Sequence, residues 1–355
     1  MPRGAPPPSS GSFRPRSRCC KGALKPHDVN LTELDRLRRL LCRLQDTIRV
    51  SVRTAQLRGM KRMARIAAIT SADTIYAIDK VSEKSVLAWF HAHWPKRWPV
   101  ELVMEGLEAS HGAVTFPHGT PVARTLFKCI LDPIDGTRGL MYEKRSAWSL
   151  AALAPQRGSK TNLSDIIVAA MTELPTSKQG LADQLSAVHG RGARVERIDL
   201  RTGRRTGFTP RPSQARNLAS GFASFAKFFP PGKAWLAERE ERLWRRLGDG
   251  MEIFDDQYLS TGGQVYELLM GHDRFIADLR PLAFAKLRLR AALACHPYDI
   301  CTALIAQELG CVITAPDGGS LRAPLDTTTG VAWVGCANPM LARRIGPQLR
   351  KLLKL

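Results

Sequence analysis

The sequence lacks several features that would place it in other classes of protein. Its eight cysteines include no Cys-x-x-Cys pair, so we expect reduced thiols and a cytoplasmic location rather than a disulfide framework. The longest stretch without a charged residue, residues 327–342, is shorter than the roughly 20 apolar residues of a membrane-spanning helix. We therefore expect no membrane partner. With 44% hydrophobic residues, the chain is also too apolar to be disordered throughout.

Acidic residues are scarce relative to basic ones: 32 stand against 53, which gives a net charge of +21. Residues 1–27 carry no acid and are rich in Pro, Gly and Ser, so we expect a disordered basic tail there. Residues 191–216 hold eight arginines. This segment fits either a solvated hairpin or a nucleic-acid surface, but no zinc-finger spacing or RNA-recognition motif accompanies it.

The apolar pattern predicts a mixed fold. Apolar residues recur every three or four positions between Leu31 and Ile48, which predicts a long amphipathic helix. Beyond it, predicted strands and helices are mixed rather than segregated, and this favours a layered α/β or α+β architecture. After Pro175 the sequence becomes rich in turn-forming residues, so we predict an N-terminal half over residues 28–175 and a C-terminal half over residues 176–355.

The most informative run is Asp132-Pro133-Ile134-Asp135-Gly136-Thr137, which follows the apolar residues 123–131. The proline keeps the first aspartate extended at a strand end, and the glycine permits a sharp turn into a helix with free amides. Two carboxylates with the Ile134 carbonyl between them suit Mg²⁺ better than zinc. The alternative is a common Asp-Gly turn in which Asp135 caps the next helix.

Two other acids stand where elements begin or end. Glu108 follows the apolar run that starts at Val103, and Asp299 opens an apolar helix after Tyr298. Either acid alone is more often a helix cap or a loop carboxylate. Together with the run at 132–137, they become candidate ligands of a metal ion that binds oxygen.

The ordered set of acidic motifs resembles the inositol monophosphatase family, which belongs to the lithium-sensitive, magnesium-dependent sugar phosphatases. The residues that carry the resemblance are Asp79, Glu108-Ala109-Ser110, the run 132–137, Tyr298-Asp299 and the segment 311–319. The resemblance implies an α+β fold, the layered α-β-α-β-α sandwich shared with fructose-1,6-bisphosphatase, with the metal site where the two halves meet. It also implies that the chain could form a homodimer.

The resemblance further implies the metal ligands and the catalytic groups. A first Mg²⁺ would bind Glu108, Asp132 and the Ile134 carbonyl. A second would bind Asp132, Asp135 and Asp299, and a third, weaker site would use Asp79 and Glu108. Glu108, together with the Thr137 and Asp79 pair, would orient and activate the water that attacks the phosphate in line.

Residues on the substrate side are implied in the same way. The amides of Gly136 and Thr137 would hold phosphate oxygens, and Asp278 would be the acid that binds a hydroxyl. The other implied substrate-binding residues are Asp135, Arg138, Gly262, Gly263 and Asp299.

The implied function is Mg²⁺-dependent hydrolysis of the phosphate monoester of a small polyol or sugar, first of all inositol monophosphate, with inhibition by lithium. Fructose 1,6-bisphosphate and a 3′(2′),5′-bisphosphate nucleotide are alternative substrates, and Arg138 and Lys144 are candidates for contact with a second phosphate. An alternative of another class is a nucleic-acid-associated accessory protein that uses the basic surface.

Overall fold

The computed structural model describes residues 30–57, 66–69, 74–107, 113–248, 252–289 and 293–355. The basic tail expected over residues 1–27 lies outside these ranges. No helix within them has the length and apolarity needed to cross a membrane.

A first, eight-stranded sheet has the order β10-β9-β8-β7-β6-β5-β3-β4. Its strands are β3 (Val100–Met104), β4 (Val114–Phe116), β5 (Phe127–Asp135), β6 (Ala147–Pro155), β7 (Val168–Leu174), β8 (Leu181–Val188), β9 (Ala193–Asp199) and β10 (Arg205–Phe208). Strands β3 and β5 run parallel, and every other neighbouring pair is antiparallel. All nine residues of β5 are buried, which marks it as a central strand of the fold.

A second sheet has the order β12-β11-β13-β15-β14. Its strands are β11 (Gly221–Phe225), β12 (Ile253–Phe254), β13 (Asp273–Asp278), β14 (Val312–Thr314) and β15 (Trp333–Cys336). A separate antiparallel pair is formed by β1 (Ile66–Ile69) and β2 (Thr74–Tyr76).

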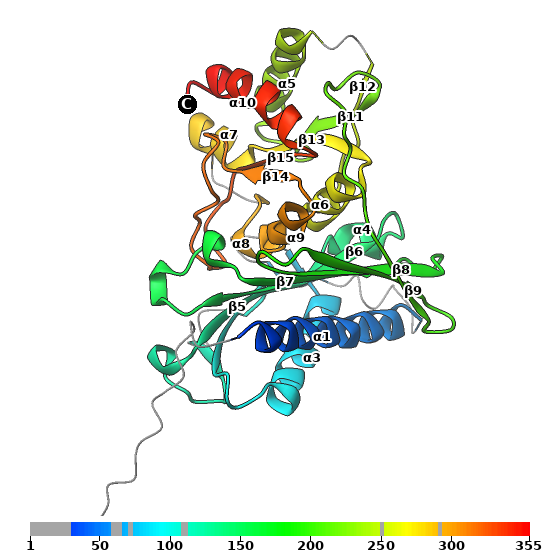
Figure 1. Cartoon of the computed structure of the whole chain (residues 1–355), viewed down its shortest axis with the longest axis vertical. Helices are drawn as coiled ribbons and strands as arrows, with labels where there is room; N and C mark the ends of the chain where they lie inside the picture. The colour runs from blue at the N-terminus through cyan, green and yellow to red at the C-terminus, as the bar shows by residue number, and fades with distance from the viewer. Residues whose placement is uncertain (1–29, 58–65, 70–73, 108–112, 249–251, 290–292) are drawn as a thin grey trace, which may run out of the picture.

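Helices form three layers around the two large sheets, which confirms the layered α-β-α-β-α architecture (Figure 1). The outer layer on the first sheet consists of α1 (Leu31–Leu57) and α3 (Ala77–His93). The middle layer holds α6 (Thr261–Met270), α8 (Pro297–Ile300) and α9 (Ala303–Glu308). The outer layer on the second sheet holds α5 (Lys233–Leu247), α7 (Arg280–Leu287) and α10 (Pro339–Leu353). The remaining short helices are α4 (Thr137–Met141), η3 (Val122–Arg124), η4 (Gly158–Lys160) and η5 (Leu163–Asp165).

Helix α1 is attached to the first sheet by apolar packing and by one buried amide. Asn30 and Glu33 exchange hydrogen bonds at its start, which satisfies two amides that a helix leaves open. Gln45 is fully buried, and its Nε2 donates to the carbonyls of Ser149 (2.9 Å) and Ala170 (2.8 Å). These bonds attach the helix to β6, which is the neighbour of β5 in the sheet, and to β7, which is the next strand beyond β6.

The change from one sheet to the other comes between β10 and β11, at residues 209–220. The boundary expected at residue 175 lies inside the first sheet, between β7 and β8, which pair directly. The turn-forming residues after Pro175 therefore belong to consecutive hairpins, which extend the first sheet and do not begin a new one.

The arginine-rich segment 191–216 supplies strands β9 and β10, and several of its cations face acids. Arg197 pairs with Asp183 (2.8 Å), and Arg205 pairs with Asp46 of α1 (2.7 Å). Arg194 approaches Asp35 of the same helix (3.6 Å). Part of the positive charge of this segment is therefore neutralised within the fold, where it helps to fix α1 against the sheet.

Candidate active site

The run at 132–137 ends β5 and continues into α4. In a regular strand, residues three apart point to opposite faces. The pairing of β5 with β6 shifts by one residue between Asp132, which lies opposite Leu150, and Asp135, which lies opposite Trp148. Because of this irregularity both aspartates line the same cavity.

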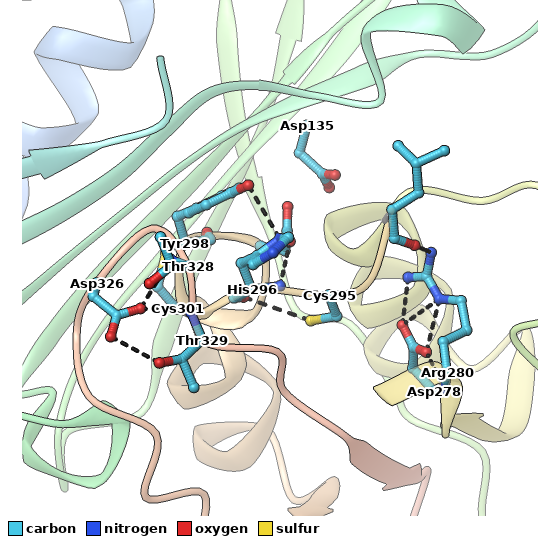
Figure 2. A network of polar contacts seen from close by, with 12 residues as sticks. Asp135, Asp278, Arg280, Cys295, His296, Tyr298, Cys301, Asp326, Thr328 and Thr329 are labelled. Atoms are coloured by element: carbon cyan, nitrogen blue, oxygen red, sulfur yellow. Dashed lines mark hydrogen bonds and ion pairs between the residues drawn. The ribbon is translucent and has the colours of Figure 1, made fainter. Parts of the chain in front are cut away.

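Asp299 reaches this cavity from the short helix α8. Its Oδ2 accepts a hydrogen bond from the amide of His296 (2.6 Å), which fixes the carboxylate at the helix start. The Tyr298 ring stacks on that of His296 with centroids 5.2 Å apart, and Figure 2 shows both side chains across from Asp135. One ligand atom each of Asp132, Asp135 and Asp299 lies within 4.8 Å of the others.

Glu105 adds a fourth carboxylate that the sequence analysis did not select. Strand β3 runs parallel to β5 with Met104 opposite Leu131, so the next residues, Glu105 and Asp132, are neighbours at the same sheet edge. The side chains of Glu105 and Asp132 form a hydrogen bond, and Glu105 lines the cavity. The signal in the sequence was its place as the first acid after the strand. We call Glu105, Asp132, Asp135 and Asp299 the acidic cluster.

Negative charge on the acidic cluster is unfavourable, because Asp132 and Asp135 are buried and the carboxylates lie close to one another. Burial, reinforced by Glu105, Asp135 and Asp299, raises the pKa of Asp132 well above its usual range. Burial and the neighbouring Asp299 raise the pKa of Asp135 to about 8. Among the described residues, no lysine or arginine forms an ion pair with the three aspartates of the cluster. The ionised cluster therefore requires a cation, and its all-oxygen donor set fits Mg²⁺ or Ca²⁺.

The start of α6 positions Asp135. The amide of Gly262 donates to Asp135 Oδ2 (2.6 Å), and the Ser260 hydroxyl and the Thr261 amide donate to the same carboxylate. These three bonds favour the charged form and partly offset the effect of burial on its pKa. A side chain at position 262 has no room, because an added Cβ would lie 2.8 Å from Asp135 Oδ2.

The cavity has a volume of about 470 Å³ and lies where elements of the two sheets meet. At the end of β5, the Thr137 hydroxyl donates to the Ile134 carbonyl (2.8 Å), and the intervening Gly136 has a positive φ of 98° that favours glycine. The expected site residues that line the cavity are Asp132, Ile134, Asp135, Gly136, Thr137, Arg138, Gly263 and Asp299. Gly262 lies behind Asp135.

Three expected residues are placed differently or not at all. Glu108 lies outside the described residues. Asp79 lies in the first turn of α3, and its side chain is outside the described part of the chain. Asp278 is fully buried and does not line the cavity, because Arg280 covers it and binds both its oxygens. The expectation that Asp278 binds a substrate hydroxyl is therefore corrected by the structure.

One wall of the cavity was not predicted as part of the site. Phe228, Phe229 and Tyr258 line it and contact one another edge to face, with ring centroids 5.5–6.0 Å apart. We call these three residues the aromatic wall. The guanidinium of Arg280 lies over it. Clustered phenylalanines in a sequence usually indicate core packing, so nothing local distinguished these from Phe225, which is core.

No protein-family model and no curated protein matches the sequence of this chain. Solved structures do match. Extragenic suppressor protein suhB from Bartonella henselae is 14% identical with a TM-score of 0.61, over 89% of this chain and 99% of that one. Leishmania major fructose-1,6-bisphosphatase is 14% identical with a TM-score of 0.62, over 90% and 94%.

An IMPase/NADP phosphatase, solved with Mg²⁺ and phosphate, is 14% identical with a TM-score of 0.59, over 89% of this chain and 95% of that one. The chain has the inositol monophosphatase-like fold. At this identity the likeness concerns the fold, so the chemistry of this inositol monophosphatase-like chain is argued from its own residues.

Gly262 provides a test of the acidic cluster. We expect Gly262→Ala to destabilise the fold by about 1–3 kcal/mol, because the new methyl group collides with Asp135 and with Leu150, 2.8 Å away. Thermal unfolding of the variant and the wild type without Mg²⁺ measures this loss of stability. The same measurement with Mg²⁺ is expected to show that the ion stabilises the variant less than the wild type. Gly263→Ala is the matched control, since its nearest neighbour would lie 3.4 Å away. Equal behaviour of the two variants would contradict this role of Gly262.

Proposed function

We propose that this chain is a Mg²⁺-dependent phosphomonoesterase that hydrolyses the phosphate ester of a small polyol or sugar. The observation that carries the proposal is the acidic cluster: carboxylate oxygens from the ends of two strands and from one helix converge at a cavity, and no lysine or arginine among the described residues forms an ion pair with the three aspartates. The fold likeness to an IMPase/NADP phosphatase solved with Mg²⁺ and phosphate supports the same chemistry.

The residues that would hold Mg²⁺ are Asp132, Asp135, Asp299, the Ile134 carbonyl and Glu105. Asp79 and Glu108 remain proposed ligands for a further ion. When bound, Mg²⁺ neutralises charge on the phosphate and lowers the pKa of a coordinated water. Both effects are needed for an ester that carries negative charge to be attacked by water at neutral pH.

The chain's own groups would bind and orient the phosphate. The amides of Gly136 and Thr137 lie at the turn after β5, where they would donate to phosphate oxygens. The Thr137 hydroxyl, held by the Ile134 carbonyl, would accept a hydrogen bond from the attacking water, with Asp79 and Glu108 proposed to share its orientation. In the reaction, the water oxygen bonds to phosphorus, the ester bond breaks, and a proton passes to the leaving alkoxide.

The cavity volume of about 470 Å³ suits a small phosphate ester. Inositol monophosphate is the first candidate substrate. Fructose 1,6-bisphosphate and 3′(2′),5′-bisphosphate nucleotides are the alternatives, with Arg138 and Lys144 at the cavity as proposed contacts of a second phosphate.

Asp132 tests the proposal most simply. We expect Asp132→Asn to lower phosphate release by at least about 1,000-fold, because a neutral amide removes one charge from the metal ligands. Release is measured from inositol 1-phosphate, fructose 1,6-bisphosphate and 3′-phosphoadenosine 5′-phosphate, with Mg²⁺, with a chelator, and with added lithium.

The control is Asp317→Asn, because Asp317 is exposed and does not line the cavity. It is expected to keep wild-type activity. Activity that survives the chelator, or an active Asp132→Asn variant, would overturn the assignment.

A second prediction separates Glu105 from Glu108. Glu105 contacts Asp132, so Glu105→Gln is expected to lower kcat by about 100-fold and to raise the Mg²⁺ concentration needed for half-maximal rate. Glu108→Gln is measured beside it and is expected to have the smaller effect on Mg²⁺ dependence. The reverse order would assign the ligand role to Glu108.

A further inference from the structure

We propose that Arg280 selects substrates that carry a second phosphate group, by binding that group at a wall of the same cavity. The inference rests on the proposed function and deepens it, since it concerns the part of the substrate beyond the ester that is cleaved. Arg280 is the first residue of α7 and lies two residues after Asp278, the last residue of β13. Its side chain lines the cavity although only 6% of the residue is exposed.

Arg280 is held rigidly by Asp278. Its Nε donates to Asp278 Oδ1 (2.9 Å) and its Nη2 donates to Oδ2 (2.5 Å), a two-bond arrangement that fixes the guanidinium plane (Figure 2). Its Nη1 donates to the carbonyl of Leu293. The guanidinium carbon lies 5.0 Å from the ring centroid of Phe228 and 5.8 Å from that of Phe229, so the aromatic wall supports one face.

The guanidinium still has donors to offer. Of its five N–H groups, three are used by Asp278 and Leu293. The other two meet no acceptor among the residues that the structure describes. Because Arg280 is nearly buried, unused donors of a charged group are costly unless a ligand accepts from them. Their place at the cavity wall makes the substrate the natural acceptor.

The chemistry of this wall favours an anion over a neutral polyol. The carboxylate of Asp278, which could have accepted from a hydroxyl, is fully buried behind Arg280. The wall therefore presents N–H donors, and phosphate offers several acceptor oxygens that match a planar guanidinium. Lys144 is an exposed cation at the rim of the same cavity, whereas Arg145 is paired with Asp256 (2.6 Å).

The test compares two esters that differ only in the second phosphate: fructose 1,6-bisphosphate and fructose 1-phosphate. The wild-type protein is expected to prefer the bisphosphate by at least about 10-fold in kcat/KM. In the double variant Asp278→Asn/Arg280→Gln, which leaves no unpaired buried charge, this preference is expected to fall to about 2-fold or less. The loss should appear as a higher KM for the bisphosphate, with kcat little changed.

A matched control exists elsewhere in the chain. Arg197 makes the same two-bond pair with Asp183 (2.8 and 2.9 Å) and lies over Phe208, but it does not line the cavity. The variant Asp183→Asn/Arg197→Gln is expected to keep the wild-type preference. If both double variants lose it equally, or if neither does, Arg280 has only a structural role.

A binding arm keeps this result separate from the proposed function. The two fructose phosphates are titrated calorimetrically into Asp132→Asn with Mg²⁺ present, and the bisphosphate is expected to bind about 10-fold more tightly, a difference lost when Asp278→Asn/Arg280→Gln is added. If wild type hydrolyses no ester but this binding preference holds, the proposed function fails and the role of Arg280 stands. If esters are hydrolysed but fructose 1,6-bisphosphate and fructose 1-phosphate bind with equal affinity, only the role of Arg280 fails.

Discussion

Repulsion among the four carboxylates at the end of β5 is the constraint on which the rest of the site depends. Asp132 and Asp135 are almost fully buried, and Glu105 and Asp299 approach them from other elements. Without a counterion this arrangement opposes folding, as the raised pKa of both aspartates indicates. We propose that a divalent cation bound among these carboxylates offsets that cost and neutralises charge on a phosphate.

Each layer of the sandwich contributes to holding that arrangement. The first sheet supplies three of the four acids from two neighbouring strands, with β3 and β5 in parallel register. The middle layer supplies Asp299 and the donors at the start of α6 that fix Asp135. The second sheet supplies the opposite side of the cavity, where Asp278 at the end of β13 holds Arg280. Elements of both halves of the chain therefore meet at the cavity.

The sequence predicted the layered fold and the run from Asp132 to Thr137 because those signals are local: an apolar strand, a turn, and carboxylates at fixed spacing. It could not rank Glu105 against Glu108, since that choice depends on where β3 ends and on its register with β5. The assignment of Asp278 to a substrate hydroxyl came from the family resemblance, and the sequence does not show that Arg280, two residues later, is buried against it. Both outcomes depend on contacts between residues far apart in the sequence, and no local pattern in one sequence predicts those contacts.

The most direct test of the acidic cluster as a cation site is a crystal structure of the protein soaked in Mn²⁺, a substitute for Mg²⁺ that is visible by anomalous scattering. We expect anomalous peaks about 2.0–2.3 Å from carboxylate oxygens of Asp132, Asp135 and Asp299. No peak at the cluster, with the carboxylates instead sharing protons through hydrogen bonds at millimolar Mn²⁺, would contradict it.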